Sequence, residues 1–497
     1  MAKRRGESQA SDQRSPSVGH RNDDDGHGHI TYAQKGRSIS LSPFGNSTFR
    51  YLFAAQITSL IGSGFTQVAL ALLAYDLMGL HAAAVLGFVW ASRVLASVIF
   101  APIFGGLVHK LPRQAWLTGL DLGRAVLVLS LFWVEDVWVL YPLIFLINVL
   151  SAGFTPVFQA VLPDVLPDED TYTRALSYSR LAYELERVLS PALAGFALFL
   201  MSFNALFVLN SLSFVISAML LWLATFPPMI PGERTDGVWH NIVFGVNAYL
   251  RTPRLQGLLA LHLVVAATGA MVIINTVAYV QGVLELSERA TAWVMAASGM
   301  GAVVAAQITP WLLEKYFDDR SLVLAAGALM LLPMLPLILG QPNVIYLAIL
   351  WAVIGFASSL VLTTAGRLVT RSCQKADRSA FFSANFALSH LMWLICYPLA
   401  GWWGDIGTDT AALGLGVVGL LALVAAFWLW PAQDRESLKH YHAQMDHQHP
   451  HYHDEHHQHE HEGWEGEEPH VHSHHHDAIL HRHKFVIDEH HEHWPKH

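Results

Sequence analysis

Long apolar segments separated by short polar turns make up most of the chain between residues 50 and 430. A membrane-spanning helix needs about 20 mainly apolar residues. Twelve segments meet this requirement, namely residues 51–78, 82–108, 115–134, 138–160, 178–201, 204–225, 256–281, 290–313, 321–340, 344–368, 380–403 and 410–430. The longest polar break, PPMIPGERTDGVWHN, divides them into six and six. The pattern predicts an all-α integral membrane protein with twelve transmembrane helices.

Polar segments precede and follow this apolar body. Residues 1–48 lack an apolar run behind their basic residues, which argues against a cleaved signal peptide and predicts a disordered leader. Residues 432–497 contain too few aliphatic side chains to offset the entropy of ordering, so we expect a disordered tail. The expected units between them are a six-helix bundle over 49–226, a central cytoplasmic loop over 227–254 and a second bundle over 255–431.

The two halves of the apolar body resemble each other. RALSYSRLAYELERVLSPALAG begins at Arg174 and RSAFFSANFALSHLMWLICYPLAG begins at Arg378. Each stretch has Arg at its start, then Ser, and ends in a Pro-containing kink before Ala-Gly. The same order at the same place in each half indicates two parallel six-helix repeats.

Basic residues are concentrated in alternate loops. Because such residues favour the cytoplasmic side, both termini are expected on the cytoplasmic side of the membrane. The basic residues in these loops are Lys110, Arg113, Arg174, Arg234, Arg251, Arg254, Lys315, Arg320, Arg371, Lys375, Arg378, Arg435 and Lys439.

Composition excludes several other functions. The chain is 53% hydrophobic and 14% charged, whereas soluble domains carry about 25% charged residues. No basic groove or zinc-finger spacing suggests nucleic-acid binding, and no Walker-type motif suggests ATP drive. Two cysteines, Cys373 and Cys396, exclude a disulfide framework and Cys-based metal clusters. We expect neither an enzyme, nor a tightly bound cofactor, nor an obligate protein partner.

Histidine dominates residues 440–497, where it is interspersed with acids at spacings such as H-x-H, H-H and H-x-x-H. Neutral imidazole binds Ni, Co, Cu and Zn well, and carboxylates add charge. A solvated low-complexity tail or a purification tag is the alternative interpretation. We expect the tail to bind Ni²⁺, Co²⁺ or Zn²⁺ through His447, His449, His451, His453, His456, His457, His459, His461, His470, His472, His474, His475 and His476.

A basic loop, GGLVHKLPRQ, follows the second apolar segment. With the six-plus-six segments, it resembles the major facilitator superfamily, whose loop pattern is roughly G-x-L-a-D-r-x-g-r-r. The matching residues are Gly105, Leu107, Lys110 and Arg113. The resemblance covers about residues 50–430. Together with the His-rich tail, it extends to bacterial nickel-resistance exporters of the NreB type.

This resemblance assigns a gating role to the loop through Gly105, His109 and Arg113. His109 stands where the superfamily usually has Asp, which puts the loop's usual charge relay in question. Asp121 and Arg124, at the start of the third segment, form a second charged pair near this gate. That pair is either a conformational latch or a structural ion pair.

Polar groups inside spanning helices are costly and are therefore candidates for function. Gln56, Ser59, Ser63 and Gln67 recur at i, i+3, i+7 and i+11, which places them on one helical stripe. The stripe faces either a central water-filled path or a neighbouring helix through interhelical hydrogen bonds.

Four ionisable residues complete the candidate site. Glu184 has the spacing to pair with Arg180 or Arg187, whereas Glu186 lies on another face and is freer to bind metal or carry a proton. His262 and His390 are the histidines well inside spans. Each is a candidate substrate ligand or a polar group satisfied within the bundle.

We therefore expect a secondary exporter of Ni²⁺, with Co²⁺ second, that confers metal resistance by proton antiport across the lipid bilayer. Moving two charges against about 100 mV costs roughly 4.6 kcal/mol, which two inward protons offset. One alternative is a proton-coupled exporter of organic compounds or drugs with an accessory metal-binding tail. Another is a membrane-tethered metal buffer or sensor.

Overall fold

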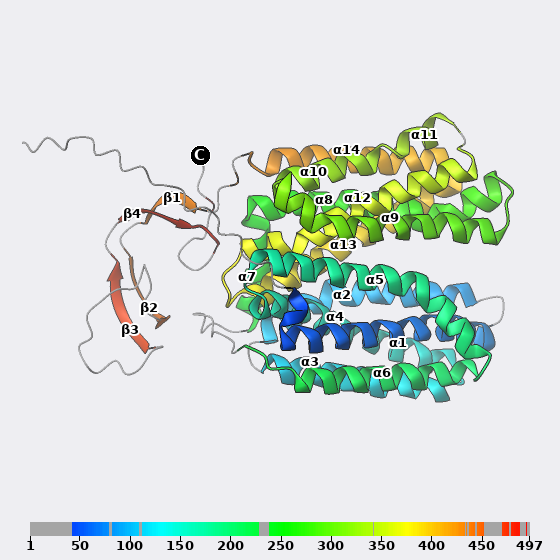
Figure 1. Cartoon of the computed structure of the whole chain (residues 1–497), viewed down its shortest axis with the longest axis horizontal. Helices are drawn as coiled ribbons and strands as arrows, with labels where there is room; N and C mark the ends of the chain where they lie inside the picture. The colour runs from blue at the N-terminus through cyan, green and yellow to red at the C-terminus, as the bar shows by residue number, and fades with distance from the viewer. Residues whose placement is uncertain are drawn as a thin grey trace, which may run out of the picture. The chain divides into compact units, whose positions relative to one another are not determined.

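The computed structural model describes residues 42–78, 82–108, 112–227, 238–340, 342–432, 434, 437–442, 445–451, 470–476, 479–487 and 494. These residues all belong to one compact unit, Ser42–His497. Its body is a set of long, roughly parallel helices in two groups, one formed by α1–α6 and the other by α8–α14 (Figure 1).

The first group contains six long helices preceded by a short 3-10 turn, η1 (Pro43–Gly45). The helices are α1 (Ser47–Met78), α2 (Ala82–Leu107), α3 (Arg113–Ser130), α4 (Val137–Val165), α5 (Glu169–Leu198) and α6 (Phe203–Leu223), with a 3-10 turn η4 (Leu131–Trp133) after α3. The carboxylates of Asp136 and Asp168 accept backbone N–H groups at the starts of α4 and α5. Such caps satisfy backbone donors that have no partner within the helix.

The second group repeats this arrangement after an additional helix. The elements are α7 (Val238–Arg251), α8 (Pro253–Val277), a π-helical turn η5 (Ala278–Val283), α9 (Glu288–Lys315), α10 (Asp319–Leu331), α11 (Met334–Leu339), α12 (Val344–Arg371), α13 (Arg378–Ile406) and α14 (Thr408–Leu429). The expected segment 321–340 is interrupted between α10 and α11, where Pro333 lacks the N–H that a continuous helix requires. The loop expected over 227–254 contains α7.

Twelve spanning helices result, as the apolar pattern predicts. Eleven helices among the described residues are long and apolar enough to cross a membrane. The twelfth is α5, which has the required length but carries Arg180, Glu184, Glu186 and Arg187 within its sequence. It packs against α1 in its own half and α9 in the other, so its charges lie at the interface between the halves.

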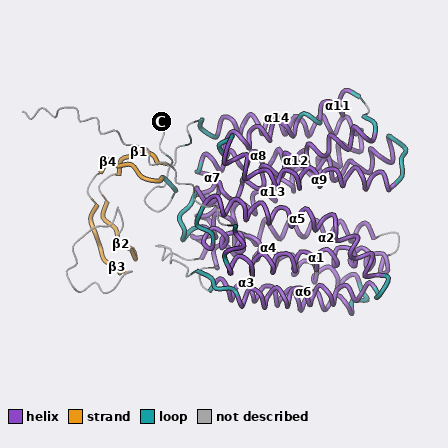
Figure 2. The backbone as a smooth tube through the Cα atoms, viewed as in Figure 1, coloured by secondary structure: helices purple, strands orange, loops and turns teal. Residues whose placement is uncertain are grey.

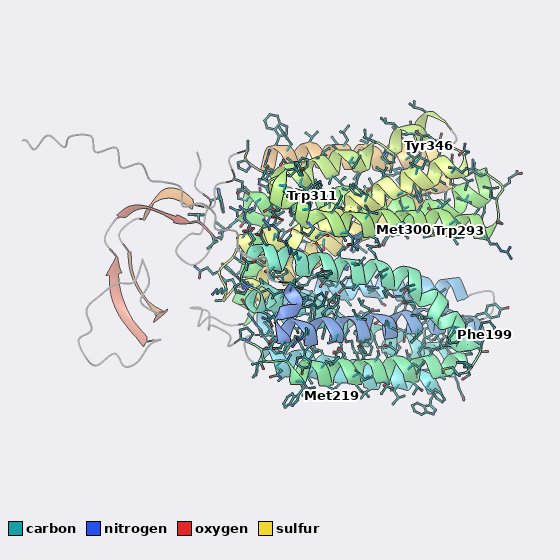
Figure 3. The ribbon with its side chains drawn as sticks, in the orientation of Figure 1. Phe199, Met219, Trp293, Met300, Trp311 and Tyr346 are labelled. Carbon is teal, nitrogen blue, oxygen red and sulfur yellow. The ribbon has the colours of Figure 1, made fainter. Side chains whose placement is uncertain are left out.

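The outer surface of the helices is apolar. Large side chains such as Phe199, Met219, Trp293 and Met300 project outward, away from the helix axes (Figure 3). In water this surface would be unfavourable, whereas lipid solvates it, and Trp rings are favoured at the membrane boundary. Buried clusters of small and branched residues hold each helix group together internally.

Four short strands follow α14, where the sequence predicted only disorder. They are β1 (Ser437–His442), β2 (Met445–His451), β3 (His470–His476) and β4 (Ile479–Lys484), paired antiparallel as β1–β4 and β2–β3 (Figure 2). The next residues, Phe485 and Ile487, are buried in the core cluster of the second helix group. A short apolar run after the histidines thus packs against the helical body.

Candidate functional site

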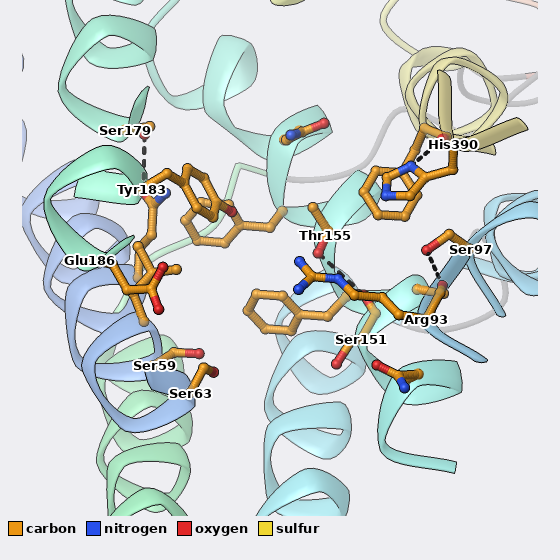
Figure 4. A pocket seen from close by; sticks show the side chains of 18 of the residues that line it. Ser59, Ser63, Arg93, Ser97, Ser151, Thr155, Ser179, Tyr183, Glu186 and His390 are labelled. Atoms are coloured by element: carbon orange, nitrogen blue, oxygen red, sulfur yellow. Dashed lines mark hydrogen bonds between the residues drawn. The ribbon is translucent and has the colours of Figure 1, made fainter. Parts of the chain in front are cut away.

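A cavity of about 530 Å³ lies between the two helix groups, within the range typical of small-molecule sites. Helices α1 to α6 of the first half and α8, α12 and α13 of the second supply its lining residues, several of which are shown from close by in Figure 4. Aromatic rings form much of the lining, with hydroxyl and amide groups between them. The aromatic members are Trp90, Phe154, Phe158, Tyr183, Phe214, Phe382, Phe386 and Trp393.

The polar stripe of α1 forms one wall of this cavity. Gln56, Ser59, Ser63 and Gln67 all line it. The side-chain oxygen of Gln56 also accepts a hydrogen bond of 3.0 Å from Ser179 on α5. The stripe therefore serves both roles considered for it, since it faces the cavity and bonds to a neighbouring helix.

The two glutamates of α5 occupy different environments. Glu184 is 1% exposed and forms an ion pair with Arg180, the i, i+4 partner expected from its spacing. Glu186 lines the cavity, with the amide of Gln67 at 3.5 Å and the hydroxyl of Ser190 at 3.4 Å. Glu186 is thus the carboxylate that a cavity ligand or a proton can reach.

The two intramembrane histidines, His262 and His390, line the cavity from the second half. The Nδ1 atoms lie 2.9 Å and 2.7 Å from the carbonyl oxygens of Leu258 and Phe386, respectively. A carbonyl only accepts, so each Nδ1 carries the proton, which leaves Nε2 as the acceptor or ligand atom. The geometry brings together Glu186, His262 and His390 around one cavity, as the candidate site requires.

Arg93 on α2 also lines the cavity and was missed in the sequence analysis. The available signal was its position within an apolar segment, because a charged residue at membrane depth is a functional candidate by default. Its guanidinium projects into the space shown in Figure 4.

Charged residues join the two helix groups at one end of the body. Asp164, at the end of α4, accepts from both Arg113 of α3 and Arg378 of α13. Arg367 of α12 contacts Glu169 of α5 at 2.5 Å and Asp319 of α10 at 3.0 Å. We call these residues and their partners the basic-end junction. The junction therefore connects the two halves at this end of the body.

Gly105 contributes to the junction through close helix packing. A Cβ placed there would lie 2.4 Å from Oγ and 2.5 Å from Cβ of Ser383 on α13. Only glycine permits this approach between α2 and α13 without a shift. Of the expected gating residues, Gly105 and Arg113 thus lie at the junction, while His109 lies outside the described residues.

Asp121 and Arg124 lie elsewhere, inside the first helix group. They pair with each other, and the hydroxyl of Ser217 donates to Asp121 at 2.7 Å. Arg124 also lies between the rings of Phe154 and Phe214, at 4.2 Å and 4.5 Å. Because every one of these partners belongs to the same half, the arrangement favours the structural interpretation over a latch between halves.

The tail histidines are only partly within the described residues. His447, His449 and His451 lie on β2, and His470, His472, His474, His475 and His476 lie on β3. Their backbones pair as His447 with His474, His449 with His472, and His451 with His470. His453, His456, His457, His459 and His461 lie outside the described residues. Over the part of the chain that the structure describes, no group of three or more His, Cys, Asp or Glu residues forms a metal site.

The family model described as "Major Facilitator Superfamily" matches residues 52–316 and 258–450. Macrolide efflux protein A of Streptococcus pyogenes is 28% identical over 226 residues, which is 44% of this chain and 54% of that protein. The matched region is thus about half the length of that relative.

Two solved structures have the same fold. The human organic anion transporter MFSD10 (TETRAN) is 12% identical with a TM-score of 0.66, covering 76% of this chain and 99% of that one. A bacterial homologue of the iron transporter ferroportin, in an outward-facing state, is 16% identical with a TM-score of 0.64, covering 77% and 99%. At these identities the likeness concerns the fold alone.

Proposed function

The chain belongs to the major facilitator superfamily, and from this premise we propose that it exports organic compounds by proton antiport. The observation that carries the proposal is the lining of the central cavity. Its walls combine large aromatic and aliphatic surfaces with many hydroxyl and amide groups and a few charged ones. Such a surface suits a bulky amphipathic molecule better than a bare metal ion, which needs several converging ligands. The macrolide efflux relative supports the same choice.

Glu186 is the group proposed to carry the proton. It lines the cavity, and its carboxylate accepts from the amide of Gln67 and the hydroxyl of Ser190. A carboxyl group there can be protonated from one side and release the proton when substrate or a conformational change alters its surroundings. Glu186→Gln is therefore expected to abolish proton-driven transport while binding persists.

The distribution of basic loops indicates which end of the helical body faces the cytoplasm. If basic loops lie inside the cell, the basic-end junction is at the cytoplasmic end, and the closed junction corresponds to an outward-facing state. Export then requires Asp164–Arg378 and Arg367–Glu169 to separate so that the cavity can load from inside.

Transport in everted membrane vesicles tests the proposal. Vesicles carrying the full chain should accumulate radiolabelled erythromycin or a lipophilic dye when their interior is made more acidic than the outside. An ionophore that collapses the gradient should stop accumulation, and Glu186→Gln should give the same result. Vesicles that accumulate ⁶³Ni²⁺ but no organic compound would overturn the proposal.

Export of Ni²⁺ or Co²⁺ is the second candidate, and the pair His262 and His390 at the cavity, below a His-rich tail, favours it. These histidines and Glu186 would then be sites at which metal and protons compete. Cells expressing the chain should retain less nickel than cells without it, and His390→Ala should abolish this difference. Deletion of residues 440–497 should reduce nickel resistance only modestly. Unchanged nickel content in the wild type would exclude this candidate.

A further inference from the structure

The guanidinium of Arg93 is exposed to the cavity near the middle of α2. It makes no hydrogen bond or ion pair with any residue that the structure describes. The guanidinium forms a cation–π contact with Trp90, whose ring centroid lies 5.9 Å from Cζ of Arg93. Arg93 therefore brings a positive charge into the cavity without a carboxylate to balance it.

Many other arginines of the helical body form ion pairs with carboxylates. Described pairs are Arg113 with Asp164, Arg124 with Asp121, Arg180 with Glu184, Arg254 with Asp434, Arg367 with Asp319, Arg371 with Asp319 and Arg378 with Asp164. Pairing is the expected outcome, because an isolated charge at membrane depth is costly. Unlike these residues, Arg93 lies near the middle of α2 beside the cavity and forms no ion pair with a residue that the structure describes.

The chemistry of the guanidinium indicates which ligand would supply the missing partner. It stays protonated at any physiological pH, and its planar fork of N–H donors matches the two oxygens of a carboxylate. The cavity's accessible acid, Glu186, interacts with Gln67 and Ser190 on the opposite wall. A fixed positive charge at this place also disfavours a bare divalent cation.

We infer that Arg93 binds a carboxylate of an amphipathic organic substrate, whose apolar part packs against the aromatic walls of the cavity. The inference rests on the proposed export of organic compounds and narrows the substrate class. Trp90 beside Arg93, and Phe386 and Trp393 on the neighbouring helix α13, provide rings against which an apolar body can pack.

A matched pair of dyes tests this assignment. Rhodamine B carries a free carboxylate, and rhodamine B ethyl ester has the same cationic ring system with an uncharged ethyl ester in place of that carboxylate. Binding of each is measured by fluorescence anisotropy with the full chain in nanodiscs, for the wild type, Arg93→Gln and Arg93→Lys. Thermal melting in the same nanodiscs verifies that each variant is folded, and Arg93→Lys keeps the charge if the Gln variant is unstable.

The wild type should bind the acid at least about tenfold more tightly than the ester, which corresponds to about 1.4 kcal/mol. Arg93→Gln should bring the two affinities within about twofold by weakening the acid alone, whereas Arg93→Lys should keep most of the preference. An acid-to-ester ratio that Arg93→Gln leaves unchanged would overturn the role of Arg93 but not organic export. A wild type that binds neither dye, or binds both equally, would overturn the inference, whereas the proposed function is tested separately by transport in the vesicles.

Discussion

Replacing Asp164 by Asn should open the basic-end junction. The carboxylate of Asp164 is 12% exposed and accepts from Arg113 in its own half and from Arg378 in the other. Asn keeps the size of the side chain but removes the charge that both guanidinium groups require. Of the two contacts that Asp164 makes, only the one with Arg378 connects the halves. Only the free energy of that contact therefore shifts the equilibrium between the closed and the open junction.

The size of this shift follows from the single cross-half contact. A hydrogen bond to a charged group contributes about 1.5–3 kcal/mol. Because 1.4 kcal/mol corresponds to tenfold, the open population should rise roughly 10- to 150-fold. The lower end is the safer expectation, since Arg367 and its partners still join the halves.

The rate at which a maleimide labels the native Cys373 measures how often the junction opens. Cys373 is 4% exposed and follows α12, three residues after Thr370, whose hydroxyl donates to Tyr172 of α5 across the junction at 3.3 Å. Opening should expose this thiol to a maleimide in proportion to the open population. Cys396, which is completely buried in the second half, is replaced by Ser so that only one thiol reacts.

Asp168→Asn provides the matched control. Asp168 lies four residues further along and caps α5 through Thr171, without contacting the second half in any described bond. Asn is an equally good cap, so this variant loses the same charge with little effect on α5. Equal labelling rates for the wild type, Asp164→Asn and Asp168→Asn would refute the assignment of Asp164 as the connection between halves.

The remaining predictions concern packing, stability, the tail and pH. Gly105→Val should also raise Cys373 labelling, because its side chain cannot fit where a Cβ already approaches Ser383 to 2.4 Å; unchanged labelling would contradict the close approach. Asp121→Asn should lower stability in detergent by about 3–5 kcal/mol, since it leaves the buried Arg124 unpaired, yet leave Cys373 labelling unchanged. Phe485→Ala removes a ring that is 2% exposed and should therefore speed tryptic cleavage of the tail. Equal cleavage rates in the variant and the wild type would contradict this expectation. Hydrogen bonds from Thr171 lower the pKa of Asp168 below its ordinary value of 3.8, so its contribution to stability is present above that value and lost as pH falls through the lowered pKa. Melting temperature should therefore fall less steeply below about pH 4 in Asp168→Asn than in the wild type.

The tail also contacts the start of α8, which its composition does not predict. The Phe485 ring packs edge-to-face against Trp494, with centroids 5.0 Å apart, and Cζ of Arg254, at the start of α8, lies 5.5 Å from the centroid of the Trp494 ring. Arg254 also binds Asp434 at 2.9 Å, just after α14. Both ends of the histidine-rich segment are thus held near the start of α8, which is why the cleavage experiment uses Phe485.

The sequence alone determined the twelve spanning helices and the division into two halves. Runs of apolar residues specify spans directly, because each run must find lipid or a helix neighbour regardless of how the chain packs. The stripe from Gln56 to Gln67 and the pair Arg180–Glu184 were also predictable, since residues on one helix are positioned by the helical repeat itself.

Only the tertiary structure decided which groups meet across helices. Asp164 and Arg378 are 214 positions apart, and no local rule pairs them. The same packing separates Asp121–Arg124 from the junction and leaves Arg93 facing the cavity without a carboxylate. Helical periodicity fixes the face on which a side chain lies, but whether that face meets an acid, a ring or a cavity depends on how the two helix groups pack.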